Sequence, residues 1–129
     1  MKLYIYIYNS MVSKNYKSME LNISKGIYII TSKLYKLNNI RKIGMSENLN
    51  NRLHNYFVGG EYYEKVYCFK NKNSKKEILK IEKIIMDKTY NYYPLELELN
   101  SEWRQIDLNK INEIIISILI KNNIDFIVE

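Results

Sequence analysis

The chain has 129 residues and a formal net charge of +6, and hydrophobic residues make up 47% of it. This length fits one domain, and this composition supports a buried core, which excludes an intrinsically disordered chain. The single cysteine excludes an internal disulfide and a multi-cysteine zinc site, and the single histidine argues against a histidine-activated nucleophile. The positive charge favours polyanions as partners, although the basic residues are spread along the chain.

No segment of the sequence has the features of a membrane span or a secretion signal. The longest apolar stretch, Ile114–Ile120, is interrupted by Ser117 and is far shorter than the roughly 20 residues that a span needs. The N-terminus carries Lys2 followed by tyrosines, where a signal peptide would have a long apolar region. We therefore expect an intracellular protein without a membrane partner, in the cytoplasm or, for a viral protein, in the host cytoplasm or nucleus.

The chain divides into an N-terminal extension, residues 1–24, and a domain over residues 25–129. Within the extension, Met1–Tyr8 alternates polar and apolar residues imperfectly, which predicts an edge strand. Asn9–Ser24 is rich in Asn, Ser and Lys, a composition typical of an irregular connection.

The domain begins with a predicted β-hairpin. Gly26–Thr31 (GIYIIT) is rich in β-branched and aromatic residues, and a second strand is predicted at Ile40–Met45 (IRKIGM). The polar turn between them, Lys36–Asn39, is so short that the two strands are expected to be antiparallel.

Helices and short strands alternate after this hairpin. Ser46 offers an N-cap for a first helix, with Glu47 suited to the positive end of its dipole, and Gly59-Gly60 ends that helix. Ser74 and Glu77 have the spacing of a capping box for a second helix. The remaining predicted elements are a strand over Tyr62–Lys70, an extended piece over Glu102–Ile106 and a closing helix over Asn109–Lys121. The order β-β-α-β-α-β-α predicts a single mixed α+β domain.

Glu82 is the charged residue whose position most needs an explanation. On a helical wheel that starts at Ile78, Glu82 falls at about 40°, inside the arc of Ile81, Ile85 and Met86. A carboxylate on the packed side of a helix costs several kcal/mol unless it is paired or binds a metal. A salt bridge at the rim of the core is the alternative explanation.

Arg52 and two glycines point to the same region of the fold. Arg52 lies on the shoulder of the buried stripe of the first helix, where it would either extend over apolar surface or clamp a phosphate. Gly26 and Gly44 lie in the paired strands, where glycine normally marks a close approach. Two such glycines on one hairpin predict a groove on the sheet.

These residues form an ordered set. Gly26-Ile27-Tyr28, Lys42-Ile43-Gly44, Arg52 and Glu82 resemble the motifs of the GIY-YIG nuclease family, and Glu102-Trp103 resembles an EW pair of a phage- and virus-rich branch of that family. The resemblance covers roughly residues 25–106. Lys42 replaces the first tyrosine of YIG, and Tyr56 stands where many members carry histidine.

The resemblance implies a small three-stranded antiparallel sheet flanked by helices, with one divalent metal, Mg²⁺ or Mn²⁺. It implies that Glu82 binds the metal, that Arg52 holds the phosphate and that Tyr28 activates or positions the attacking water. The expected reaction is hydrolysis of nucleic acid, with DNA the expected polymer, to 5′-phosphate and 3′-hydroxyl ends.

The residues themselves are compatible with this chemistry. If the hairpin register brings Lys42 near Tyr28, the cation would lower the pKa of the phenol by about 1–3 units. Mg²⁺ often retains several waters, so one carboxylate is a sufficient protein ligand. Tyr35 and Ser46 are further candidates for lining the groove, together with Gly26 and Gly44.

Two other functions are consistent with the sequence. An inactive module of the same fold would bind nucleic acid through its lysines and its 13 tyrosines. A structural or assembly protein would form a homodimer through the apolar closing helix, Ile111–Ile120.

Overall fold

The computed structural model describes residues 25–70, 74–97 and 99–129. The edge strand predicted at Met1–Tyr8 and the connection predicted at Asn9–Ser24 lie outside the described residues.

The described residues form a single α+β domain with one antiparallel sheet of five strands in the order β4-β2-β1-β3-β5. The three central strands are β1 (Lys25–Ser32), β2 (Ile40–Ser46) and β3 (Glu61–Phe69). The short strands β4 (Trp103–Gln105) and β5 (Phe126–Val128) extend the sheet at its two edges. The predicted α+β fold class is confirmed. The predicted three-stranded sheet corresponds to the three central strands of the observed five-stranded sheet.

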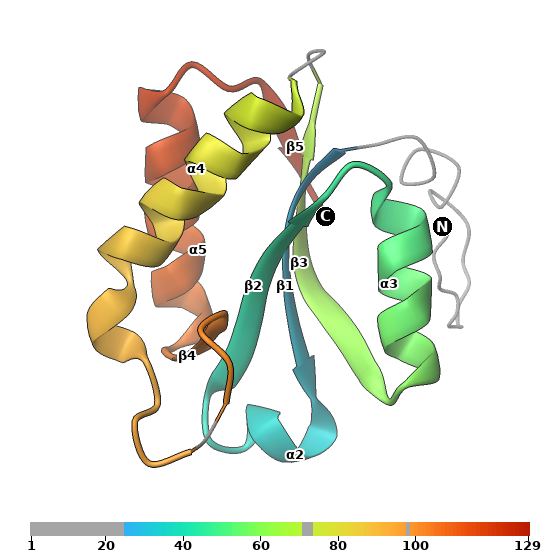
Figure 1. Cartoon of the computed structure of the whole chain (residues 1–129), viewed down its shortest axis with the longest axis vertical. Helices are drawn as coiled ribbons and strands as arrows, with labels where there is room; N and C mark the ends of the chain where they lie inside the picture. Colours follow the sequence, from blue (N-terminus) through green and yellow to red (C-terminus); the bar gives the residue numbers. More distant parts are fainter. Residues whose placement is uncertain (1–24, 71–73, 98) are drawn as a thin grey trace.

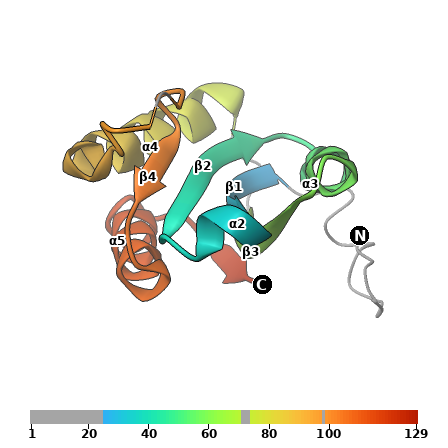
Figure 2. The same ribbon diagram turned by 90° about the horizontal axis from the view of Figure 1, so that it is seen from below.

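Helices cover both faces of this sheet (Figure 1). Helix α3 (Leu49–Val58) lies on one face, and α4 (Lys75–Lys88) and α5 (Leu108–Lys121) lie together on the other, as Figure 2 shows from below. The short helix α2 (Lys33–Lys36) occupies part of the predicted hairpin connection, and the 3₁₀ turn η1 (Tyr90–Tyr92) follows α4.

The main core lies between the sheet and the pair α4–α5. Alternate residues of the central strands, such as Ile27, Ile29 and Ile43, meet the buried isoleucines of both helices there. Helix α5 buries Ile111, Ile115, Ile118 and Leu119, so the closing helix covers the sheet as its apolar pattern predicts. No helix within the described ranges is both long and apolar enough to cross a membrane.

Local sequence explains where most helices begin and end. Ser74 and Glu77 form the predicted capping box at the start of α4, and Gly59 caps the C-terminal end of α3. The N-cap predicted at Ser46 is wrong, because Asn48 caps α3 and accepts a hydrogen bond from Asn51 N. Ser46 remains in β2, where it pairs with Gly26.

Candidate active site

The sheet face under α3 centres on Tyr28, which is 1% exposed. Tyr28 pairs with Gly44 across the hairpin, and a Cβ atom on Gly44 would lie only 2.4 Å from the tyrosine hydroxyl oxygen. Gly44 therefore leaves the room that the phenol ring occupies. A close approach at this glycine is confirmed, and the approaching group is Tyr28 itself.

Gly26 has a different reason for lacking a side chain. A Cβ atom there would lie 1.9 Å from the carbonyl oxygen of Tyr67 in β3. The space beside Gly26 is thus filled by the neighbouring strand, so Gly26 serves strand packing and does not open the predicted groove.

Two side chains from α3 meet the Tyr28 hydroxyl. Arg52 donates a hydrogen bond to it from Nη1 at 3.3 Å, and the Tyr56 hydroxyl lies 3.1 Å away. Arg52 and Tyr56 are four residues apart, a spacing that puts both on one side of a helix. Their stripe turns toward the sheet because Leu49 and Leu53 anchor the helix.

Lys42 lies next to Tyr56 and does not contact Tyr28 directly. Its Cα pairs with Ile30, one step along the face from the Tyr28–Gly44 pair, and its ammonium nitrogen lies 5.0 Å from the centre of the Tyr56 ring. Glu102, just before β4, forms an ion pair with Lys42 at 3.4 Å. We expected Lys42 to lie near Tyr28. Instead, Lys42 contacts Tyr56, and Tyr56 in turn contacts the Tyr28 hydroxyl.

The titration of Tyr28 also differs from the expectation. Burial, with a smaller contribution from Tyr56, raises the pKa of Tyr28 well above its ordinary value, and the opposing effect of Arg52 does not offset this. Burial lowers the pKa of Lys42, but the interactions with Tyr56 and Glu102 outweigh it and raise that pKa overall. At neutral pH the site therefore contains a protonated tyrosine and a charged lysine.

Glu82 projects from α4 and is partly buried, as the helical wheel predicts. Among the described residues it forms neither an ion pair nor a hydrogen bond, so the alternative of a rim salt bridge is not observed there. Burial and the charge of Glu102 raise the pKa of Glu82, whereas Arg52 lowers it. The carboxylate thus belongs electrostatically to the same cluster as Arg52 and the Lys42–Glu102 pair.

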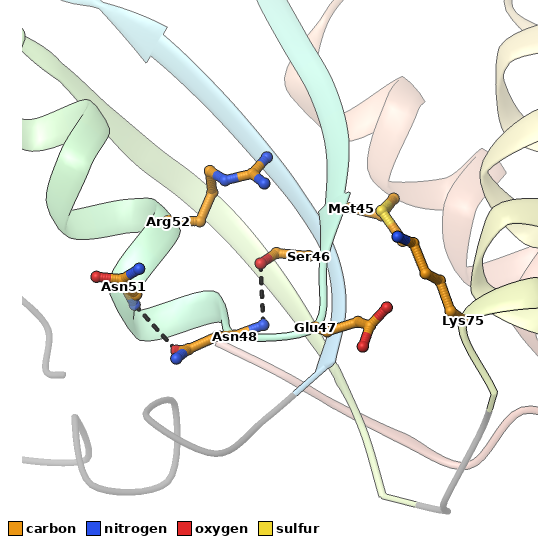
Figure 3. Close-up of a pocket in the computed structure, with 7 residues that line it drawn as sticks. All are labelled: Met45, Ser46, Glu47, Asn48, Asn51, Arg52 and Lys75. Carbon is orange, nitrogen blue, oxygen red and sulfur yellow. Dashed lines mark hydrogen bonds between the residues drawn. The ribbon is translucent and has the colours of Figure 1, made fainter.

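A polar pocket opens beside Arg52, between the end of β2 and the starts of α3 and α4 (Figure 3). Ser46 lines it and accepts a hydrogen bond from Asn48 N at 3.0 Å. Tyr35 is absent from this lining, and its ring packs edge-on against Trp103 at 4.9 Å between centroids. The structure therefore brings together Tyr28, Lys42, Gly44, Arg52 and Tyr56, with Ser46 in the pocket beside Arg52. Glu82 is linked to this cluster by the effect of Arg52 and Glu102 on its pKa.

The sequence named Tyr56 and Glu102 through the family resemblance but did not predict their contacts in this region, and it did not point to Lys75. The four-residue spacing from Arg52 was a usable signal for Tyr56. Glu102 was named only as part of the EW pair, and its contact with Lys42 could not be predicted, because it depends on the pairing of β4 with β2. Lys75 reaches the pocket because α4 begins beside the end of β2, an arrangement set by tertiary structure.

Comparison with known proteins gives one family match. The family model of the T5orf172 domain matches residues 25–119. No curated protein and no solved structure matches the chain. The matched segment spans most of the chain, including every site residue described above, and the chain belongs to the T5orf172 domain family.

Proposed function

We propose that this protein is a metal-dependent endonuclease that hydrolyses phosphodiester bonds in nucleic acid. DNA is the proposed substrate, and 5′-phosphate and 3′-hydroxyl ends are the proposed products. The T5orf172 domain is phage-associated and related to GIY-YIG-like and homing endonuclease folds, which supports a nuclease-related role. The observation that carries the proposal is Glu82, a partly buried carboxylate without an ion pair among the described residues, whose pKa the charge of Arg52 lowers.

The residues around Glu82 fit a magnesium or manganese ion that retains most of its waters. Within the described part of the chain no group of three or more acidic, histidine or cysteine side chains gathers, so a closed structural metal site does not fit. Mg²⁺ commonly uses one or two carboxylates together with water and substrate phosphate oxygens. When bound, such an ion would polarise the phosphate and lower the pKa of a bound water.

Tyr28 acts in this account as a hydrogen-bond donor that orients the attacking water. Because burial raises its pKa, the phenol keeps its proton at neutral pH and is unsuited to act as the general base. Its oxygen accepts from Arg52, which leaves the hydroxyl proton for a further partner.

Lys42 is placed to act on Tyr28 through Tyr56. Its ammonium nitrogen lies 5.0 Å from the centre of the Tyr56 ring, and the Tyr56 hydroxyl lies 3.1 Å from the Tyr28 hydroxyl, where either group can be the donor. In the arrangement in which Tyr56 donates, two donors, Tyr56 and Arg52, meet the Tyr28 oxygen, and the Tyr28 proton remains for the attacking water.

Arg52 is the proposed phosphate ligand. Guanidinium groups carry five N–H donors in a planar fork, and only the Nη1 contact to Tyr28 is used here among the described contacts. The remaining donors suit two oxygens of one phosphate. Arg52 thus couples the scissile phosphate to the hydroxyl that orients the water.

A plasmid-nicking assay with Mg²⁺ tests the proposal. Glu82→Gln is expected to lower the rate at least about 100-fold, and Tyr28→Phe about 10- to 100-fold, which are usual losses for groups that act in the transition state. Asp87→Asn is the matched control, since it makes the same change at an exposed position of the same helix, and its rate should stay within about twofold.

The two alternatives give different results in the same experiment. Undiminished cleavage by Glu82→Gln and Tyr28→Phe would remove the assignment of these residues. Binding that persists in EDTA, without cleavage by the unchanged chain in Mg²⁺, would favour the inactive module. Neither binding nor cleavage, with a dimer by sedimentation, would favour the assembly protein.

A further inference from the structure

The proposed reaction gives no function to the pocket beside Arg52. The pocket has a volume of about 350 Å³, and its walls come from the end of β2, the connection Glu47–Asn48, the first turn of α3 and the first residue of α4. In Figure 3 the Arg52 side chain points from α3 toward the strands, and Lys75 reaches across from α4 toward Met45. Arg52 therefore belongs both to this pocket and to the Tyr28 cluster.

The neutral side chains of the pocket are left mainly as hydrogen-bond donors. Ser46 Oγ already accepts from Asn48 N at 3.0 Å, and Asn48 Oδ1 accepts from Asn51 N at 3.2 Å. What remains for a ligand includes the Ser46 O–H and the side-chain N–H groups of Asn48 and Asn51. In the first turn of α3 the Asn51 N–H already donates to Asn48 Oδ1, so the contacts proposed for the ligand are those of the side chains.

The charges of the pocket select a singly charged anion. Arg52 and Lys75 contribute two positive charges and Glu47 one negative charge, which gives a net charge of at most +1, because Arg52 is shared with the scissile phosphate. An internal phosphodiester carries one negative charge, whereas a terminal phosphate monoester carries about 1.5 to 2 at pH 7. The pocket is therefore better matched to the interior of a polynucleotide than to its phosphorylated end.

We infer that this pocket binds an internal phosphodiester of the DNA strand next to the scissile phosphate, with Lys75 as its principal contact beyond Arg52. The inference rests on the proposed function for the position of the scissile phosphate. It assigns the substrate class as internal diesters, which corresponds to endonucleolytic attack.

The test is the salt dependence of binding to a fluorescent DNA duplex that lacks terminal phosphates, measured by anisotropy in EDTA. Lys75→Ala is expected to weaken binding about fivefold and to reduce the slope of log affinity against log salt by about 0.9, as for the loss of one phosphate contact. Lys80→Ala removes the same charge from an exposed position of the same helix outside the pocket and should change affinity less than about twofold.

A second variant makes the test independent of any folding defect. Glu47→Gln removes the negative charge of the pocket and is expected to tighten binding severalfold. If Lys75 and Glu47 had a purely structural role, the two substitutions would not change DNA affinity in opposite directions. Equal effects of Lys75→Ala and Lys80→Ala, or no salt-dependent binding by the unchanged chain, would overturn the inference.

Cleavage is scored separately, so the two proposals can fail separately. If cleavage depends on Mg²⁺ and Glu82 while Lys75 and Lys80 behave alike, the pocket assignment fails and the proposed function stands. If no variant cleaves but the binding pattern is as expected, the proposed function fails and the pocket binds a diester in a binding module.

Discussion

At the scale of single residues, the position of Glu82 on the packed side of α4 is not explained by a gain in stability. Its pKa is raised, chiefly by burial and then by Glu102, so the fold favours the protonated carboxyl. The stability gained from that preference is present below the unfolded pKa and is lost as the pH rises through the folded pKa. At neutral pH the ionised side chain therefore lowers the free energy of unfolding.

We predict that Glu82→Gln is more stable than the unchanged chain at pH 7. Glutamine is nearly isosteric and uncharged, so it avoids the desolvation of the carboxylate, and the melting temperature should rise by a few degrees. Near pH 4, where the carboxyl is mostly protonated, the difference should disappear. Thermal unfolding at both pH values checks this, and a Glu82→Gln protein that melts lower at pH 7 would contradict it.

Gly44 gives a second prediction at this scale. A methyl group there would lie within 2.4–2.8 Å of the Tyr28 ring and hydroxyl, so Gly44→Ala should cost about 1–3 kcal/mol and displace the phenol. In a Tyr28→Leu background the same substitution should lower the free energy of unfolding much less, because the ring and hydroxyl that clash with the new methyl group are absent. A double-mutant cycle by urea unfolding measures this coupling, and additive effects would rule the contact out.

Single residues also show how far the sequence predicts the site. Helical spacing correctly predicted that Glu82 is turned toward the packed side of its helix, and the strand glycine correctly marked a close approach at Gly44. The contact of Lys42 could not be predicted, because it depends on the hairpin register and on where α3 sets Tyr56. Burial of Tyr28, which sets the direction of its pKa shift, is likewise a property of the assembled fold.

At the scale of elements, Arg104 in β4 fixes the C-terminal end of α4. Its guanidinium is buried and donates to Thr89 Oγ1 at 3.0 Å and to the carbonyl oxygen of Met86 at 3.1 Å. It also donates to the carbonyl oxygens of Ser101 and Trp103, both at 2.8 Å. One side chain thus ties the helix that carries Glu82 to the strand that follows Glu102.

We predict that Arg104→Ala lowers the free energy of unfolding by about 3 kcal/mol, because it leaves several buried acceptors without donors. Arg104→Lys should recover little of this loss, since an ammonium cannot reproduce the planar fork. Urea unfolding gives both values. A loss below about 1 kcal/mol for the alanine variant would show that the contacts are replaced by water or by rearrangement.

The elements were predicted where their signals are local. Capping residues, terminal glycines and strand composition correctly predicted the hairpin, α3, β3, α4 and α5. Helix α2 was missed because a four-residue helix has too little pattern, and β5 because its three residues form a strand only by pairing with β3. The N-cap was misplaced at Ser46 because pairing with Gly26 keeps that residue in the sheet.

At the scale of the whole molecule, the site exists because the sheet brings distant segments together. Strand β4 pairs with β2 about 60 residues along the chain, and this pairing sets Glu102 beside Lys42. Helix α4 lies on the other face of the sheet (Figures 1 and 2), and the charges of Glu102 and Arg52 both affect the pKa of its Glu82. The fold class could be predicted from element order, whereas the strand order depends on long-range pairing that no local pattern encodes.

The central claim is that a divalent ion binds the Glu82 carboxylate next to Arg52 and Tyr28. The most direct test is a crystal structure of the protein soaked in Mn²⁺, with an anomalous difference map to locate the metal. The account predicts a peak about 2–2.5 Å from a Glu82 carboxylate oxygen, with water in the other positions, and no such peak in Glu82→Gln crystals treated in the same way. Manganese bound only elsewhere on the molecule, at a concentration that supports cleavage, would contradict it.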